Sequence, residues 1–440
     1  MPIAWKNDSI EPDTSSSNVE SESIVKRLRL TGLWHHPDFL KLWGGQTVSL
    51  FGSQVSLLAI PLTAVLVLNA TALQMGILTA LGTLPTLLFG LFAGVWVDRL
   101  HRRPILIVAD AGRFLLLCLI PLSAVTGILH IGILYVLTFL VGILTIFFNV
   151  AYRSYLPSLI EREQLIEGNS KLELSQSVSE IVGPGLAGTL VQILTAPVAI
   201  LIDAFSFLVS ALSLAWIRTP ERLPERDTKQ KGMLREIAEG LRFVFGKPIL
   251  RALTSSFATL TLFNSVLEAV FILYLTRALG ITPVVLGIIF AISSIGFLLG
   301  ALLAGWLTHR IGIGITLLLT PLVIGGSDLL IPLAGQAPLL AIPLIGLAQL
   351  LFGLARPVFS INQVSLRQAL TPERLQGRMN ASVSFVVFGI PAIGALLGGV
   401  LGQDIGLQKT LIIAAAGEIL ACLWIFFSPV RRLREELKAG

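Results

Sequence analysis

The stretch Ile131–Leu156 reads IGILYVLTFLVGILTIFFNVAYRSYL and carries no charged residue before Arg153. As a helix, an apolar run of this length is long enough to cross the hydrocarbon core of a bilayer, which is about 30 Å thick. Similar runs recur outward from it, between Leu42 and Trp216 and again between Leu253 and Phe427. A transmembrane β-barrel would show short alternating segments instead.

The composition also indicates that lipid, rather than water, surrounds most of the protein. Hydrophobic residues make up 54% of the chain and charged residues 13%, with a mean hydropathy of +0.83. Lipid must therefore surround most of the protein, and every backbone amide within it needs an internal partner. We predict an all-α membrane protein with twelve transmembrane helices. The expected spans are 40–68, 74–98, 104–127, 131–156, 169–194, 197–217, 250–278, 283–309, 313–333, 337–366, 378–404 and 408–429.

Basic residues gather on one side of these spans. They are Lys26, Arg27, Arg29, Arg99, Arg102, Arg103, Arg162, Arg218, Arg222, Arg226, Lys229, Lys231, Arg235, Arg374, Arg378, Arg431, Arg432 and Arg434. The opposite loops offer Arg277 and Lys409. The positive-inside bias then places both termini in the cytoplasm and the chain in the plasma (inner) membrane. Contact with anionic membrane lipids explains the net charge of +6, so we expect no nucleic-acid partner.

The sequence also repeats itself at an offset of 211 residues. That offset aligns Gly76 with Gly287, Gly94 with Gly305, Arg99 with Arg310, Asn169 with Asn380, Gly183 with Gly394 and Gly188 with Gly399. Two parallel six-helix bundles related by a pseudo-twofold axis can rock about a central site, which is alternating access. The expected organisation is a disordered cytoplasmic tail (1–36), a bundle (37–217), a cytoplasmic linker with an amphipathic helix (218–247), a second bundle (248–429) and a cytoplasmic tail (430–440).

The turn after the second span reads GVWVDRLHRRP from Gly94 to Pro104. It resembles the loop 2–3 signature of the major facilitator superfamily, Gly-x-x-x-Asp-Arg-x-Gly-Arg-Arg, with His101 at the last glycine. The resemblance implies the major facilitator fold and a cytoplasmic latch that holds the two halves together in the outward-open state. It assigns gating to Gly94, Asp98, Arg99, Arg102 and Arg103, and a weaker counterpart to Gly305 and Arg310. The alternative is plain anchoring by positive charge.

The fifth span carries small residues at four-residue spacing, which place one narrow face against a neighbouring helix. Ser179, Gly183, Pro184, Ala187 and Gly188 resemble the superfamily's exporter motif, Gly-x8-Gly-x3-Gly-Pro-x2-Gly-Gly, with three glycines replaced. The resemblance implies efflux antiport and a seal on the outer side of the cavity; ordinary helix packing is the alternative. Similar faces, offered as partners, are Gly296, Gly300 and Ala304; Gly394, Gly398 and Gly402; and Gly82, Thr86, Gly90 and Gly94.

Ionisable and amide side chains inside the spans are candidates for ion coupling or substrate binding, because an unpaired charge in hydrocarbon is costly. The candidates are Glu268, Glu180, Asp203, Asp110, Arg113, Gln54 and Asn264. Glu268 ranks first because spans 1, 4, 7 and 10 line the cavity in the resembled family. Asp110 and Arg113 lie three residues apart and are expected to pair structurally. Asp328 and Glu418 have no partner nearby in sequence, and each acid could instead be hydrogen-bonded between helices.

No phosphate-binding loop, metal-ligand spacing or catalytic cluster is present in the sequence, so we expect no cofactor, no metal and no enzymatic activity. Three stretches resemble the macrolide-efflux and siderophore-exporter branch of the superfamily: Leu42–Ser53 in span 1, Arg153–Pro157 after span 4 and Leu201–Phe207 in span 6. The leading hypothesis is a monomeric, proton-coupled exporter of a bulky, largely apolar small molecule. The alternatives are an importer of a small metabolite on the same fold and a membrane interaction or lipid-handling protein without solute transport.

Overall fold

The computed structural model describes residues 32–97, 99–219, 221 and 242–433, and within these ranges the chain is helical without strands. Eleven of the described helical segments are long and apolar enough to cross a membrane. The remaining long helix, α14, has 32 residues and takes the place of the eleventh expected span. The prediction of an all-α membrane protein built from two six-helix bundles is confirmed.

Six long helices form the first bundle. They are α2 (Pro37–Leu62, extended by the π-helical turn η2, Thr63–Val67), α3 (Ala72–Val97), α4 (Arg102–Val125), α5 (Ile131–Leu159), α6 (Leu165–Leu194) and α7 (Ala196–Ala215). Short 3₁₀ turns lie at Leu33–His35 and Arg162–Gln164.

The second bundle repeats this order. Its helices are α9 (Pro248–Leu273, extended by the π-helical turn η4, Tyr274–Ala278), α10 (Pro283–Ile311), α11 (Ile313–Asp328) with the short α12 (Leu330–Ala334), α13 (Ala341–Ala369), α14 (Glu373–Asp404) and α15 (Leu407–Phe426). Further 3₁₀ turns lie at Pro338–Leu340 and Pro429–Arg432.

The repeat in the sequence is a repeat in structure. Pro37 begins α2 and Pro248 begins α9, 211 residues later, each at a first helical position where proline's missing N–H costs nothing. The two π-helical turns, η2 and η4, begin at Thr63 and Tyr274 with the same offset. Even the irregular parts of the helices therefore recur in both halves.

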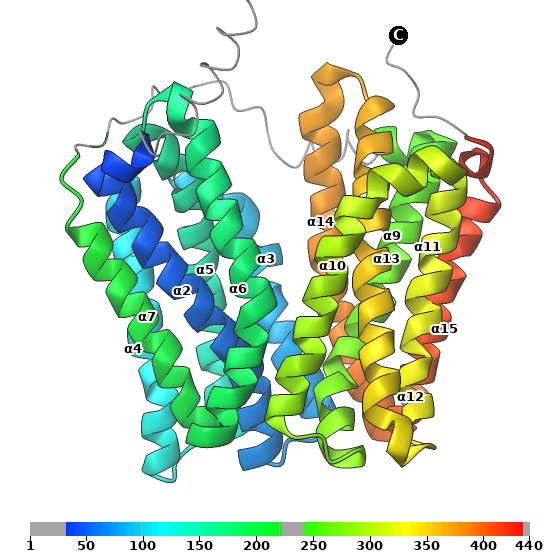
Figure 1. The fold of residues 1–440 in the computed structure, drawn as a ribbon, viewed down its shortest axis with the longest axis horizontal. Coiled ribbons are helices and arrows are strands. Elements are labelled where there is room, and N and C mark those ends of the chain that lie inside the picture. Colours follow the sequence, from blue (N-terminus) through cyan, green and yellow to red (C-terminus); the bar gives the residue numbers. More distant parts are fainter. Residues whose placement is uncertain (1–31, 98, 220, 222–241, 434–440) are drawn as a thin grey trace, which may run out of the picture.

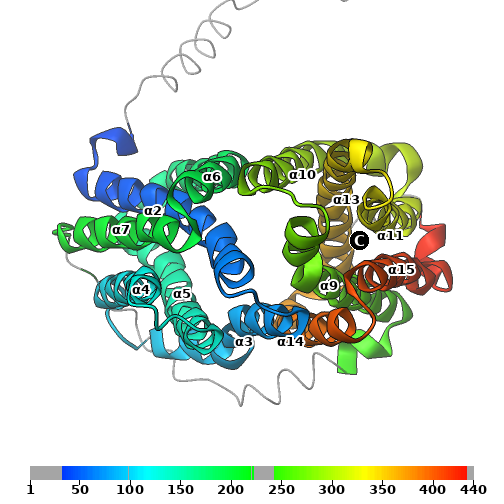
Figure 2. The same cartoon turned by 90° about the horizontal axis from the view of Figure 1, so that it is seen from below.

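The two bundles stand side by side and meet at one end (Figure 1). At the end where the described chain begins and ends, their helices diverge, and α6 with α10 and α3 with α14 form the two sides along which the bundles touch (Figure 2). The amphipathic linker helix expected before α9 falls largely outside the described residues. Its described end, residues 242–246, is helical.

Two small-residue faces expected to pair with the fifth span pack inside their own bundle instead, which corrects that part of the prediction. Gly296 and Gly300 of α10 lie against the backbone of α13, and Gly394 and Gly398 of α14 lie against that of α9. The glycine spacing identified close helix contacts correctly but could not identify the partner helix, because any helix can approach such a face.

Candidate functional site

Four glycines close the end of the molecule that lies away from the chain termini. A Cβ added to Gly188 of α6 would overlap the carbonyl oxygen of Pro283, and one on Gly287 of α10 would overlap that of Pro184. On the other side of the molecule, Gly76 of α3 and Gly399 of α14 lie backbone to backbone. The 211-residue offset relates Gly76 to Gly287 and Gly188 to Gly399, so the two contacts are pseudo-symmetric copies of one another.

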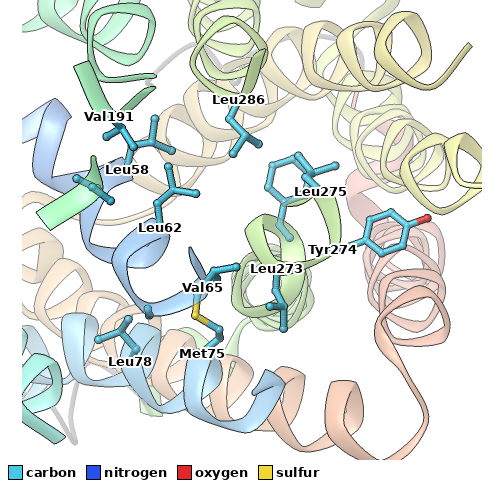
Figure 3. Packing of buried hydrophobic residues seen from close by; sticks show 14 of the residues in the cluster. Leu58, Leu62, Val65, Met75, Leu78, Val191, Leu273, Tyr274, Leu275 and Leu286 are labelled. Carbon is cyan, nitrogen blue, oxygen red and sulfur yellow. The ribbon is translucent and has the colours of Figure 1, made fainter. Parts of the chain in front are cut away.

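Apolar side chains from both bundles fill the space between these two contacts (Figure 3). Leu62, Val65 and Val191 come from the first bundle, and Leu273 and Leu286 come from the second; all are at most 3% exposed. Burial of this cluster stabilises the closed end through the hydrophobic effect wherever water would otherwise enter. Together with the four glycines, the cluster forms a seal, which we call the glycine seal.

The opposite end lacks the corresponding contacts. A Cβ on Gly94 of α3 or on Gly305 of α10 would meet nothing within 4 Å, although the two glycines occupy equivalent positions in the halves. Of the Gly82–Gly94 face, a Cβ on Gly82 would lie in van der Waals contact with Thr138 of α5, whereas Gly94 lies at the end where the bundles have separated.

Two arginines of the loop 2–3 signature, Arg102 and Arg103, contact the end of α7 and the first residues of the linker. The backbone N–H groups of Arg102 and Arg103 donate to the Glu221 carboxylate, at 2.8 Å and 3.2 Å, where an anion is stabilised by the start of α4. The Arg103 guanidinium donates to the carbonyl oxygens of Leu214 and Ala215 at the end of α7. Asp98 lies outside the described residues, and the latch role of this group stays a prediction.

His101 and Gly312 occupy the same position in the two halves but differ in backbone conformation. Gly312 has φ 85° and ψ 149°, a region that is almost restricted to glycine, whereas His101 has φ −65° and ψ 129°. The substitution of the signature's glycine by His101 therefore changes the turn between α3 and α4 without straining it. Arg310, in the second copy, lies over the Trp306 ring at 5.8 Å from its centroid.

A cavity of about 780 Å³ opens inside the first bundle between α2, α5 and α6. Its lining is mixed, with aromatic and aliphatic surface beside amides and charged groups. The lining residues are Gln46, Leu50, Asn149, Tyr152, Arg153, Leu156, Asn169, Ser170, Leu172, Glu173 and Gln176. This size and lining suit a drug-sized molecule held by apolar contact and oriented by a few polar groups.

Several of these lining residues were not among the sequence candidates. Asn149, Tyr152 and Arg153 lie three and four residues apart, and Glu173 and Gln176 lie three apart on the next helix. That spacing puts each set on one helix face. A search for polar stripes in spans 4 and 5, rather than for isolated acids, would have found them.

The exporter-type motif of α6 contacts α2 within the first bundle as well as α10. Ser175 accepts a hydrogen bond from the Trp43 indole at 2.9 Å, and Gly183 lies against the side chain of Gln54. Ser179 and Ala187 are fully buried, and Pro184 offers its carbonyl to the Gly287 contact. One face of α6 thus packs on α2, while Pro184 and Gly188 carry the seal to the other bundle.

Three candidate ionisable residues meet in the core of the first bundle. Asp110 and Arg113 form an ion pair, and the Arg113 guanidinium lies over the rings of Phe148 and Phe207, 4.4 Å and 4.0 Å from their centroids. Asp203 accepts a hydrogen bond from Ser206 at 3.2 Å. These side chains are at most 4% exposed, so the cluster holds α4 to α7 and does not reach the cavity.

The remaining candidates lie apart from that cluster. Glu180 is exposed and accepts a hydrogen bond from Gln176, which lines the cavity. Glu268 is exposed on α9 although its neighbours on both sides are buried, whereas Asn264, one turn earlier, is 8% exposed. The structure brings Asp110, Arg113 and Asp203 together and leaves Glu180 and Glu268 separate.

The two pseudo-symmetric six-helix bundles, closed at one end and open at the other, define the protein as a transporter of the major facilitator fold. A family model described as transmembrane secretion effector, within the major facilitator superfamily, matches residues 33–439, and the chain belongs to that family.

Three relatives of similar length are exporters by name. The chain is 28% identical over 393 residues to the multidrug efflux pump Tap of Mycolicibacterium fortuitum, covering 87% of this chain and 93% of the relative. It is 26% identical over 404 residues to macrolide efflux protein A of Streptococcus pyogenes, covering 90% and 96%. It is 26% identical over 425 residues to the enterobactin exporter EntS of Citrobacter koseri, covering 93% and 96%.

Solved structures share the fold at lower identity. A bacterial homologue of the iron transporter ferroportin in its inward-facing state superposes with a TM-score of 0.69 at 19% identity, covering 88% of this chain and 98% of that one. The same homologue in its outward-facing state gives a TM-score of 0.53 with the same coverage. The nucleoside transporter NupG gives a TM-score of 0.69 at 12% identity, covering 88% and 98%.

Proposed function

We propose that this protein is a secondary active efflux transporter that exports bulky, largely apolar compounds by alternating access. The observation that carries the proposal is the unequal packing of equivalent glycines, which are in contact at one end and free at the other. A molecule built in this way has one closed gate and one open gate at a time. The names of the exporter relatives support the direction of transport.

The open end is assigned to the cytoplasm. Most basic residues of the described loops lie at that end, including those of the loop 2–3 signature, and the positive-inside bias favours this orientation. The better superposition with the inward-facing than with the outward-facing neighbour supports the same state. A compound would enter the cavity of the first bundle from the cytoplasm, and opening of the glycine seal would release it outside.

The substrate class follows from the lining of the cavity. Tyr152, Leu50 and Leu156 offer apolar surface, while Gln46 and Asn149 offer amides that can orient a polar group of the ligand. A macrolide, a lipophilic drug or a siderophore would fit these requirements. A proton gradient supplies the energy in this proposal, with buried carboxyl groups as the carriers.

The test is an efflux and susceptibility panel in a host deleted for its own pumps. The intact chain is expected to lower the accumulation of macrolides and other lipophilic drugs and to raise resistance, and an uncoupler should abolish both effects. Asp98→Asn tests the latch, with exposed Asp404→Asn as the control. Accumulation that rises when the chain is expressed would instead favour the importer hypothesis.

A further inference from the structure

Two acids from different helices meet in the core of the second bundle. Gly325 of α11 lets that helix approach α15 so closely that a Cβ there would overlap the carbonyl oxygen of Ala415. Asp328 and Glu418 lie three residues beyond Gly325 and Ala415, and their carboxyl groups come within hydrogen-bonding reach of each other. Asp328 is 1% exposed and Glu418 is fully buried.

The two carboxyl groups can hydrogen-bond to each other only if one of them carries a proton. All four carboxyl oxygens are buried, and none accepts a hydrogen bond from a donor in the described part of the chain. Ionised carboxylates only accept hydrogen bonds, so two of them cannot bond to each other. One proton shared between Asp328 and Glu418 provides the missing donor.

The charges around the pair lead to the same conclusion. Arg356 of α13 and Glu268 of α9 both act electrostatically on Asp328 and Glu418, and within the described part of the chain they are the other charged groups found to act on the pair. One arginine can compensate one of three carboxylates. Since Glu418 lies near the middle of the 20-residue helix α15, the uncompensated charge would be within hydrocarbon, where it is costly.

The pair has no counterpart in the first bundle. The positions 211 residues earlier are Leu117 and Phe207, which are apolar. The acids of the first bundle are instead supplied with donors, because Asp110 pairs with Arg113 and Asp203 bonds to Ser206. The unsatisfied pair is therefore a feature of the second bundle rather than of the repeated fold.

Glu268 provides a route from water to this pair. It is the exposed residue in a stretch of α9, Asn264–Leu273, whose other members are buried or half-buried. A proton that binds this exposed carboxyl group would enter a region where Arg356 acts electrostatically on all three acids. No group of three side chains that could hold a metal ion exists among the described residues.

We propose that Asp328 and Glu418 form a proton-binding site in the second bundle, with Arg356 as the cation that acts on the pair and Glu268 as the exposed acid through which a proton enters. That the pair holds a proton is a claim about the resting protein. That this proton drives export rests on the proposed function, and the two claims need separate readouts.

Infrared spectroscopy of the purified full chain at neutral pH tests the first claim. Subtracting the spectrum of the Asp328→Asn/Glu418→Gln double variant should leave the C=O band of a protonated carboxyl group, shifted by exchange into D₂O. The exposed Asp404→Asn variant should leave no such band. A difference spectrum that contains only ionised carboxylate bands would overturn the proposal, whether or not the chain exports anything.

Transport in everted vesicles tests the second claim, with a macrolide as the probe. The double variant should lose accumulation driven by a pH gradient by about tenfold or more, while exchange of macrolide in the absence of a gradient persists. Equal gradient-driven accumulation in the double variant and in the intact chain would overturn the coupling role. Absence of gradient-driven accumulation in the intact chain would refute the proposed function, and the infrared result would still decide whether the pair binds a proton.

Discussion

The closed end and the open end of this molecule are built from equivalent residues that are packed differently. Gly76 and Gly188 lie against the opposite bundle, whereas Gly94 and Gly305 have open space around them. Because the halves repeat, each end carries its own symmetric pair of glycines. In the proposed alternating-access cycle, glycine at both ends would allow either end to close, so the packing of each end would set the state of the transporter.

One turn at each end has another residue where the equivalent turn of the second bundle has glycine, and the two turns differ in backbone conformation. At the closed end, Thr195 has the same backbone conformation as its counterpart Gly406. Its angles are φ 76° and ψ 155°, and those of Gly406 are φ 91° and ψ 156°. At the open end, His101 does not adopt the backbone conformation of its counterpart Gly312. Thr195 thus holds a conformation that costs of the order of 1–3 kcal/mol for a residue with a side chain. The turn at Thr195 is therefore strained, whereas the turn at His101 is not.

The largest effect is expected from breaking the glycine seal. Gly188→Val forces a branched side chain into the backbone of α10, which costs about 3 kcal/mol or more and should lower efflux by at least about a hundredfold at equal expression. Macrolide accumulation in a pump-deleted host measures it. Gly185→Val is the matched control, because its Cβ would lie in open space on the same helix. Equal losses in both variants would contradict the seal.

A smaller effect is expected at the open end. Gly94→Val and Gly305→Val meet no atom in this conformation, so thermal stability should change by less than about 1 kcal/mol. They should block closure of this end and lower efflux by about tenfold. Melting curves and efflux assays on the same preparations separate the two effects. Loss of stability comparable to that of Gly188→Val would show that this end is already packed.

The turns give the next test. Gly312→Ala should destabilise the protein by about 1–3 kcal/mol because alanine is strained at φ 85°. Thr195→Gly should stabilise by about 1 kcal/mol for the converse reason. His101→Ala should be nearly neutral, since its φ of −65° suits any residue. Thermal unfolding of the three variants measures these changes, and a destabilising Thr195→Gly would contradict the strain.

The smallest effect concerns the start of α4. Glu221→Ala removes the acceptor of the Arg102 and Arg103 N–H groups and should cost about 1 kcal/mol, while Glu221→Gln should cost less because an amide oxygen still accepts. Unfolding midpoints compare the two variants. If both left stability unchanged, Glu221 would not anchor the open end of the first bundle.

Sequence alone predicted most of the fold, because hydrocarbon allows few solutions. The spans expected at 283–309 and 408–429 are observed at Pro283–Ile311 and Leu407–Phe426. The 211-residue offset of the sequence also relates the starts of α2 and α9. Glycine spacing also marked where helices come close. It could not tell that Gly287, rather than Gly296 or Gly300, meets α6, because that choice depends on the tilt of whole bundles.

The candidate site was harder to predict. Asp328 and Glu418 were each recognised as acids without a neighbour in sequence, but their meeting depends on the approach of α11 to α15 at Gly325. The cavity lining was overlooked because Asn149 and Gln176 are neutral amides, which the sequence does not separate from ordinary interhelical hydrogen bonds. Chemistry that depends on packing between distant segments is visible only once the helices are in place.

The most direct test of alternating gates is a pair of distances in one protein. With Cys118 and Cys422 replaced, spin labels at the exposed, symmetry-related Glu161 and Pro372 report the open end, and labels at the exposed, symmetry-related Leu66 and Arg277 report the closed end. When a macrolide is added at a pH that favours the other state, the first distance should shorten and the second should lengthen. Two distances that stay fixed, or that change in the same direction, would contradict the account.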